Sequence, residues 1–270
     1  MAKEQISPDF KIDKIVSYLS KHKENLKKLY TWQFKIDSSN EIWKGYETQV
    51  NAINSLAKNQ NFDREIQLKQ LVREIFNSND TTQHKALMNW LVKEWGGIKT
   101  GAELNFEREE FIKDEKKLKF DRIASYSKIA AFMFPEECII YDSRVAYSLN
   151  WILLAEDAST TFFPIPEGRN SKMMAFDMNT LIHIKTKNSF AVENEIPKNH
   201  ISEVHKKLFI NKDKAYHCLN KLISEVNTQL WLDQPERQQH LYYTEMLLFS
   251  IADNIVFNDI VSRLNITISK

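Results

Sequence analysis

The chain has 270 residues, of which 43% are hydrophobic and 11% aromatic, so it can bury a sizeable packed core. Its five glycines are few for a Rossmann or phosphate-binding loop, and its formal net charge of +1 gives no overall attraction to nucleic acid. The two cysteines, Cys138 and Cys218, lie far apart, which favours a reduced, cytoplasmic protein. No apolar run approaches the roughly 20 residues of a membrane span.

Apolar residues recur every three or four positions through most of the chain, which predicts an all-α fold. The predicted helices cover residues 9–30, 41–58, 63–77, 82–95, 121–134, 143–155, 200–229 and 235–265. Residues 157–170 (DASTTFFPIPEGRN) read as a loop, and residues 181–187 (LIHIKTK) as a strand or a helix end. We therefore expect one helical domain over residues 1–270, with irregular or minor β content near residues 160–198. Residues 157–170 are the best position for a seam between two lobes.

One carboxylate, Asp142, stands between an apolar run and a predicted helix in KIAAFMFPEECIIYDSRVAYSLN, residues 128–150. An aspartate there can cap the helix by accepting hydrogen bonds from its free N–H groups. The same hydrogen bonds favour the ionised form, which can stabilise a sugar cation or orient a water molecule. Capping and catalysis both remain open interpretations, and they do not exclude each other.

The same stretch resembles the helix–loop–Asp–helix segment of the helix-hairpin-helix DNA glycosylase superfamily, particularly bacterial proteins similar to 8-oxoguanine DNA glycosylase. IIYDSRVAYSL carries the resemblance, and Asp142 takes the position of the catalytic aspartate. The resemblance implies two helical lobes with a cleft between them. It also implies cleavage of the N-glycosidic bond of a damaged or modified base flipped out of double-stranded DNA. Residues 120–155 show it most clearly, and residues 90–98 (WLVKEWGGI) and 239–253 (QHLYYTEMLLFSIAD) are compatible with it.

The chain departs from the superfamily pattern at two places. The Gly-x-Gly turn that binds phosphate is absent from KLKFDRIASYSK, so other backbone amides, Ser125, Ser127 or lysine side chains would have to supply that contact. Lys128 lies one helical turn closer to Asp142 than the nucleophilic lysine of bifunctional members. A desolvated Lys128 could act as that nucleophile, whereas a charged one would be solvated or contact the DNA backbone. Because Lys128 is out of register, we expect a monofunctional hydrolase in which Asp142 activates water.

Other side chains complete the expected site. Contacts to DNA are expected from Lys119, Arg122, Arg144, Arg169 and Asn170, and Tyr141 and Phe163 are expected to line the base pocket. Each has a plainer explanation, because surface arginines, polar loops, solvated helix faces and core aromatic rings are common in helical proteins.

No motif indicates a metal or another cofactor. The seven histidines show no zinc-binding spacing, and two cysteines cannot hold an iron–sulfur cluster. We expect a protein without cofactors, favoured as a monomer, whose partner is double-stranded DNA. The alternative is a catalytically inactive helical module that binds DNA or protein in bacterial repair or anti-phage defence. A third interpretation is a helical scaffold in which Asp142 is only a cap.

Overall fold

The computed structural model describes residues 9–57, 59–98, 120–167, 170–186 and 199–264. These residues form helices joined by turns and loops, and they contain no strand, which confirms the predicted all-α class. The β content expected near residues 160–198 amounts, within the described ranges, to one isolated parallel bridge between Phe162 and Phe209.

Short 3-10 and π segments, labelled η, lie between the α-helices. The first third contains α1 (Ile12–Ser20), η1 (Lys23–Asn25), α2 (Leu26–Leu29), η2 (Glu41–Trp43), α3 (Glu47–Ser55), α4 (Asn61–Phe76), α5 (Thr81–Trp90) and η3 (Leu91–Trp95). The middle contains η5 (Phe120–Arg122), α7 (Ile123–Met133), α8 (Ser143–Ala155), α9 (Ser171–Ala175) and α10 (Met178–Lys185). The last part contains α11 (His200–Leu208), α12 (Lys212–Leu230), α13 (Pro235–Gln238), α14 (Tyr242–Ile251), η7 (Ala252–Val256) and α15 (Phe257–Arg263).

Several helices predicted as continuous are divided. The clearest case is the prediction for residues 200–229, which the structure breaks between α11 and α12. Phe209 leaves the helix there because the neighbouring backbone pairs with Phe162: the Phe162 N–H donates to the Leu208 carbonyl at 2.8 Å, and the Ile210 N–H donates to the Phe162 carbonyl at 2.9 Å. These tertiary hydrogen bonds replace helical ones, and helical periodicity does not reveal them.

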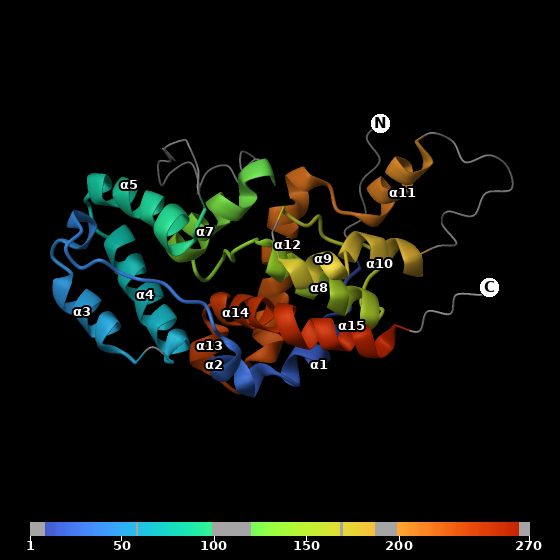
Figure 1. Cartoon of the computed structure of the whole chain (residues 1–270), viewed down its shortest axis with the longest axis horizontal. Helices are drawn as coiled ribbons and strands as arrows, with labels where there is room; N and C mark the ends of the chain where they lie inside the picture. Colours follow the sequence, from blue (N-terminus) through green and yellow to red (C-terminus); the bar gives the residue numbers. More distant parts are fainter. Residues whose placement is uncertain (1–8, 58, 99–119, 168–169, 187–198, 265–270) are drawn as a thin grey trace, which may run out of the picture.

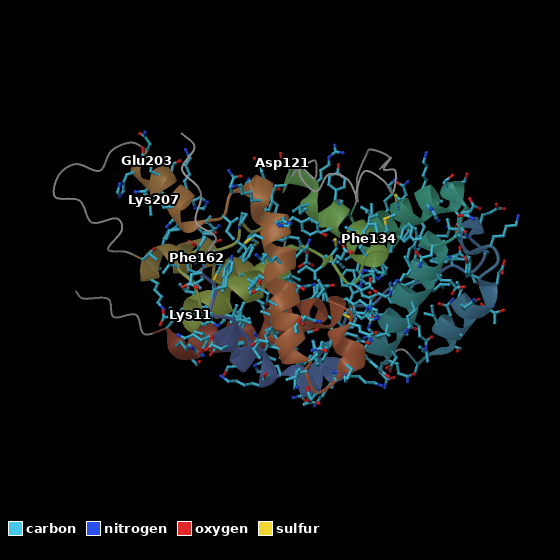
Figure 2. All side chains as sticks on the ribbon, turned by 180° about the vertical axis from the view of Figure 1, so that it is seen from behind. Lys11, Asp121, Phe134, Phe162, Glu203 and Lys207 are labelled. Atoms are coloured by element: carbon cyan, nitrogen blue, oxygen red, sulfur yellow. The ribbon has the colours of Figure 1, made fainter. Side chains whose placement is uncertain are left out.

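The helices form an elongated body, with α3, α4 and α5 at one end and α10, α11 and α15 at the other (Figure 1). The opposite view shows α12 crossing the middle of the molecule (Figure 2). Helix α7 packs against α4, whereas α8 packs against α14 and η7. The connection between α7 and α8, which carries Asp142, therefore joins two groups of packed helices.

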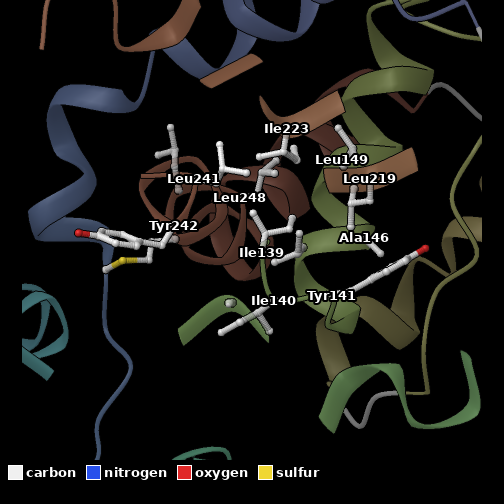
Figure 3. Packing of buried hydrophobic residues seen from close by; sticks show 14 of the residues in the cluster. Ile139, Ile140, Tyr141, Ala146, Leu149, Leu219, Ile223, Leu241, Tyr242 and Leu248 are labelled. Carbon is white, nitrogen blue, oxygen red and sulfur yellow. The ribbon is translucent and has the colours of Figure 1, made fainter. Parts of the chain in front are cut away.

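The apolar run ahead of Asp142 lies in the centre of the core. Residues 139–141 are buried among side chains of α8, α12 and α14 (Figure 3). The Ile139 N–H donates to Asn220 Oδ1 at 3.1 Å, and the Tyr141 N–H donates to Ser127 Oγ at 2.9 Å. Because this run is not helical, its buried backbone groups depend on side chains of α7 and α12 for hydrogen bonds.

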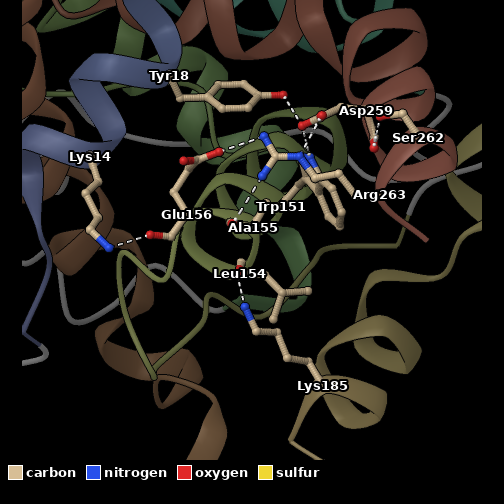
Figure 4. Close-up of polar contacts among 10 residues, drawn as sticks. All are labelled: Lys14, Tyr18, Trp151, Leu154, Ala155, Glu156, Lys185, Asp259, Ser262 and Arg263. Carbon is tan, nitrogen blue, oxygen red and sulfur yellow. Dashed lines mark hydrogen bonds and ion pairs between the residues drawn. The ribbon is translucent and has the colours of Figure 1, made fainter. Parts of the chain in front are cut away.

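A polar network fastens the far end of α8 to α1 and α15. Arg263 forms ion pairs with Asp259 and Glu156, each at 2.8 Å. The Tyr18 hydroxyl and the Trp151 indole N–H donate to the same Asp259 oxygen at 3.0 and 2.8 Å (Figure 4). One carboxylate thus links three helices, and α8 is fixed at the end opposite Asp142.

A buried chain of hydrogen bonds sets the position of α14 against α12. The Trp231 indole N–H donates to Thr244 Oγ1 at 3.0 Å, and the Thr244 hydroxyl donates to Asn227 Oδ1 at 2.6 Å. The Asn227 amide then donates to the Gln238 carbonyl at 2.8 Å. All three side chains are buried, so these hydrogen bonds link α14 to the end of α12 inside the core.

We expect Thr244→Val to lower the free energy of unfolding by about 1–3 kcal/mol, measured by urea denaturation. The substitution keeps the side-chain shape but leaves the Trp231 N–H and the Asn227 oxygen buried without this partner. The matched control is Thr228→Val on the exposed face of α12, where the hydroxyl only bonds the Ser224 carbonyl and the loss should stay within about 0.5 kcal/mol. Equal losses in both variants would contradict the role given to Thr244.

Candidate active site around Asp142

Asp142 caps helix α8. Its backbone is extended, with φ −107° and ψ 176°, and its Oδ1 accepts a hydrogen bond from the Val145 N–H at 2.9 Å. The capping predicted from the sequence is confirmed. The side chain is half-buried, and it also lines a pocket.

The Asp142 pocket has a volume of about 140 Å³. It is lined by Tyr30, Trp32, Trp95, Gly96, Lys128, Ile140, Asp142, Arg144, Glu245 and Phe249. These residues come from the end of α2, the segment that follows it, η3, α7, the connection to α8, α8 itself and α14. The fold therefore brings Lys128 and Asp142, the two predicted catalytic residues, to the same pocket.

Aromatic rings form much of the pocket wall. The Trp32 ring meets those of Trp95 and Phe249 edge to face, with centroids 6.0 Å apart in both pairs. The Tyr30 ring lies 6.1 Å from that of Phe249. The Trp32 indole N–H is buried and has no hydrogen-bond partner within the described ranges. A wall of this kind offers flat faces and one free donor to a planar ring.

Lys128 reaches the pocket past a glycine. Its side chain is buried, and its Nζ donates to the Ala124 carbonyl of its own helix at 2.7 Å. A Cβ on Gly96 would lie 2.8 Å from both Cδ and Cε of Lys128, so only glycine leaves room for this path. Burial lowers the pKa of Lys128, although the charges of Asp142 and Glu245 act in the opposite direction.

Glu245 adds a buried carboxyl group from α14. Its side chain is 4% exposed, and its Oε2 has no hydrogen-bond partner in the part of the chain that the structure describes. Burial, opposed by the charges of Lys69 and Lys128 and assisted by those of Asp142 and Glu65, raises the pKa of Glu245 from 4.5 to about 8. Glu245 is therefore mainly a neutral carboxylic acid at pH 7.

A buried ion pair lies next to the aromatic wall of the pocket. Glu65 and Lys69 lie one turn apart on α4, with Nζ and Oε1 separated by 3.4 Å. The Lys69 Nζ also lies 4.2 Å from the centre of the Phe132 ring. The second Glu65 oxygen accepts the indole N–H of Trp95 at 3.1 Å. The pair thereby fixes the orientation of one aromatic wall of the pocket.

Arg144 and Asn170 meet at one carboxylate beside the pocket. Arg144 forms an ion pair with Asp253 at 3.1 Å and lies 4.8 Å from the centre of the Phe249 ring. Asn170 caps α9 and donates to the same Asp253 at 2.6 Å. A groove of about 330 Å³ begins here and shares Trp32, Arg144 and Phe249 with the Asp142 pocket.

Four residues predicted for the site lie in the core instead. Ser125, Ser127, Tyr141 and Phe163 are buried, the last three completely. Ser127 accepts the Tyr141 N–H, and the Phe163 ring stacks on Phe10 with centroids 5.6 Å apart. The predicted phosphate contacts of the two serines and the predicted base contacts of Tyr141 and Phe163 are therefore wrong, because these side chains are packed inside the core.

The remaining DNA-contact candidates divide into two groups. Arg122 is exposed at the N-terminus of α7, next to neither pocket nor groove. Lys119 and Arg169 lie outside the residues that the structure describes.

Sequence patterns missed several residues of the pocket. Glu245 could have been recognised as a candidate site residue, because it is the only charged residue in LYYTEMLLFSIA, residues 241–252. Trp32 and Tyr30 lie at or beyond the end of a helix, where periodicity carries no information. Trp95 is 5% exposed and belongs to the core, and its ring also lines the pocket.

Comparison with known proteins found no matching protein-family model, no matching curated protein and no matching solved structure. None of the helices in the described ranges combines the length and the apolar composition that crossing a membrane requires. Within the same ranges, His, Cys, Asp and Glu side chains form no cluster of three or more suited to a metal ion.

We expect Glu245→Gln to stabilise the protein increasingly as the pH rises. The folded-state pKa of Glu245 is about 8, above its ordinary value of 4.5, so folding takes up a proton between these values. The wild-type free energy of unfolding therefore loses a contribution as the pH rises through this range, by on the order of a few kcal/mol. Glutamine does not titrate and escapes this loss.

Urea unfolding of both proteins at pH 5 and pH 9 measures the effect. The stability of Glu245→Gln relative to wild type should be greater at pH 9 than at pH 5. The control is Glu225→Gln on the exposed face of α12, for which the difference should not change with pH. A pH-independent difference for Glu245→Gln would show that Glu245 is ionised in the folded protein.

Proposed function

We propose that the protein is a DNA N-glycosylase that accepts a flipped, damaged or modified base in the Asp142 pocket and cleaves its N-glycosidic bond. One observation carries the proposal. The aspartate at the position of the superfamily's catalytic residue uses one oxygen to cap α8 and lines a pocket walled by aromatic rings. A carboxylate held in this way stabilises positive charge on a sugar, and the rings stack on a base.

The stretch that resembles the superfamily and the two stretches that are compatible with it converge on this pocket, which further supports the proposal. Residues 120–155 contribute Lys128 and Asp142. Residues 90–98 contribute Trp95 and Gly96, and residues 239–253 contribute Glu245 and Phe249. Segments far apart in the sequence thus supply acid, base and stacking groups to one cavity.

In the proposed reaction, water is the nucleophile. Breaking the C1′–N bond leaves an oxocarbenium-like sugar, which the Asp142 carboxylate stabilises while it accepts a proton from the attacking water. The Lys128 amine is held by the Ala124 carbonyl of its own helix, and Lys128 therefore serves as a charged or polar neighbour rather than as the attacking group.

Double-stranded DNA is the proposed partner, bound by a cytoplasmic monomer. Arg144 stands at the border of the pocket and the adjoining groove, and Lys28 lines the groove, so both can meet phosphates next to a flipped nucleotide. Because Arg144 is paired with Asp253, a phosphate would have to compete with that carboxylate. We therefore propose modest, salt-sensitive affinity.

We expect Asp142→Asn to abolish base excision while it preserves the fold. Duplex oligonucleotides that carry one oxidised, alkylated, deaminated or phage-type modified base are incubated with protein and then treated with alkali to reveal abasic sites. Asparagine caps helices about as well as aspartate but carries no charge, so excision should fall by roughly 100-fold or more at nearly unchanged melting temperature. The matched control is Asp80→Asn, which alters the cap of α5 away from the pocket.

The other outcomes of this assay are equally informative. Wild-type protein that binds duplex DNA but excises no base from a broad panel would be a catalytically inactive DNA-binding module. Protein that neither binds nor cleaves DNA would contradict the proposal. A large loss of stability in Asp142→Asn at unchanged excision would leave Asp142 with the capping role alone.

Borohydride trapping tests the nucleophile. With water as the nucleophile, we expect no covalent protein–DNA adduct when wild-type protein, sodium borohydride and a cleavable duplex are combined, and strand breaks should appear only after alkali. An adduct that disappears in Lys128→Ala and persists in Lys221→Ala, on the exposed face of α12, would instead make Lys128 the nucleophile and the enzyme bifunctional.

A further inference from the structure

Glu245 carries an oxygen to which no group among the described residues donates a hydrogen bond. It is the only acidic side chain of α14, and it lies beside Lys128 and Asp142 on the wall of the Asp142 pocket. This oxygen is Oε2, and it is buried. The other buried carboxylate nearby, Glu65, accepts the Trp95 N–H with Oε2, and its Oε1, which has no hydrogen bond either, forms an ion pair with Lys69 at 3.4 Å. A buried polar atom left unpaired is destabilising, and a ligand in the pocket could pair with it.

Burial favours the neutral form of Glu245, and the charges around it act in both directions: those of Lys69 and Lys128 lower its pKa, and those of Asp142 and Glu65 raise it. The ionisable groups that face it from the surrounding elements are Glu65 and Lys69 on α4, Lys128 on α7, Asp142 before α8, Arg144 on α8 and Tyr30 at the end of α2. Arg144 is already paired with Asp253 of η7, and α12 contributes the neutral Asn227. When both lysines are protonated, they balance Glu65 and Asp142, and Glu245 fits without a charge.

A neutral acid in this position matches a requirement of N-glycosidic cleavage. When the C1′–N bond breaks, its electron pair stays with the departing base. A base that enters the pocket uncharged would leave as an anion, which is unfavourable where water is excluded. A proton delivered during bond breaking removes that charge, and a carboxylic acid that titrates near the working pH is suited to deliver it.

We propose that Glu245 is the proton donor to the leaving base, and that the substrates are therefore bases that are electrically neutral in DNA. This inference rests on the proposed glycosylase function. Glu245 acts on the base, whereas Asp142 acts on the sugar and the water.

Each proton and electron pair in the proposed step is accounted for. The C1′–N bond breaks, its electron pair goes to the base, and the Glu245 carboxyl proton moves to a ring nitrogen or an exocyclic oxygen of that base. Water forms the new C1′–O bond and transfers a proton to Asp142. The products are a neutral free base and an abasic sugar with a hydroxyl at C1′. Solvent then restores the proton to Glu245 and removes the one from Asp142 after product release.

The charge of the base decides whether its departure requires a proton donor. Purines alkylated at N7 or N3 already carry a positive charge and leave as neutral molecules without a proton donor. Oxidised and deaminated bases are neutral and need one. We therefore expect excision of neutral bases to depend on Glu245, and any excision of cationic bases to be independent of it.

The test compares wild type with Glu245→Gln. Glutamine keeps a hydrogen-bond donor in the pocket but cannot release a proton, which separates recognition from proton transfer. Single-turnover excision is measured from pH 6 to pH 9 on duplexes that contain 8-oxoguanine, uracil or N7-methylguanine, together with every other base that wild type removes from the broader panel. Rates without protein are subtracted, and Glu225→Gln serves as the control.

We expect wild type to remove at least one neutral base at a rate that falls about tenfold per pH unit above the pKa of Glu245. Glu245→Gln should be slower by roughly 100-fold or more on that base, and its remaining rate should not show this fall. If Glu245→Gln does not fold, the wild-type profiles decide: the alkaline fall must appear for a neutral base and be absent for any cationic base that is cleaved.

Failure of this inference differs from failure of the proposed function. If wild type removes only cationic bases, or if Glu245→Gln removes a neutral base at close to the wild-type rate, the proton-donor role is overturned and the glycosylase proposal stands. If wild type removes no base of any kind, both are overturned.

Discussion

Asp142 faces the pocket because the backbone ahead of it is buried and cannot move independently. Residues 139–141 cross the core without a helix, so their N–H and C=O groups need partners from elsewhere. Asn220 accepts the Ile139 N–H, the Tyr216 hydroxyl donates to the Ile139 carbonyl, and Ser127 accepts the Tyr141 N–H. Residues whose hydroxyls or rings were expected at DNA instead hold this segment in place. The position of the candidate catalytic group thus depends on α7 and α12 as much as on the helix that it caps.

The same burial gives the pocket its chemistry. Lys128 and Glu245 are both taken out of water, which shifts both pKa values toward the neutral forms, downward for the lysine and upward for the glutamate. Asp142 remains partly in contact with solvent and keeps a hydrogen bond from the helix N-terminus. Two carboxyl groups in one pocket therefore have different environments, which is the usual condition for different roles in acid–base catalysis.

The sequence predicted local features well where neighbouring residues alone determine them. Helix α8 and its cap follow from an aspartate placed before an apolar 3.6-residue stripe, and the structure has both. The division between α11 and α12 was not predictable, because it depends on a bridge to Phe162 more than 40 residues earlier in the chain. The buried Glu65–Lys69 pair was equally hidden, since the same residues at the same spacing usually form an exposed pair on a helix surface.

The sequence by itself determined the all-α class, the cap at Asp142 and the presence of Lys128 one short connection before it. Only the tertiary structure decided that these two residues share a pocket, that Tyr141 and Phe163 belong to the core, and that Trp32, Glu245 and Phe249 complete the wall. The physical reason is that periodicity and capping are properties of neighbouring residues. A pocket, and the desolvation that changes the pKa values inside it, arises where distant segments pack together.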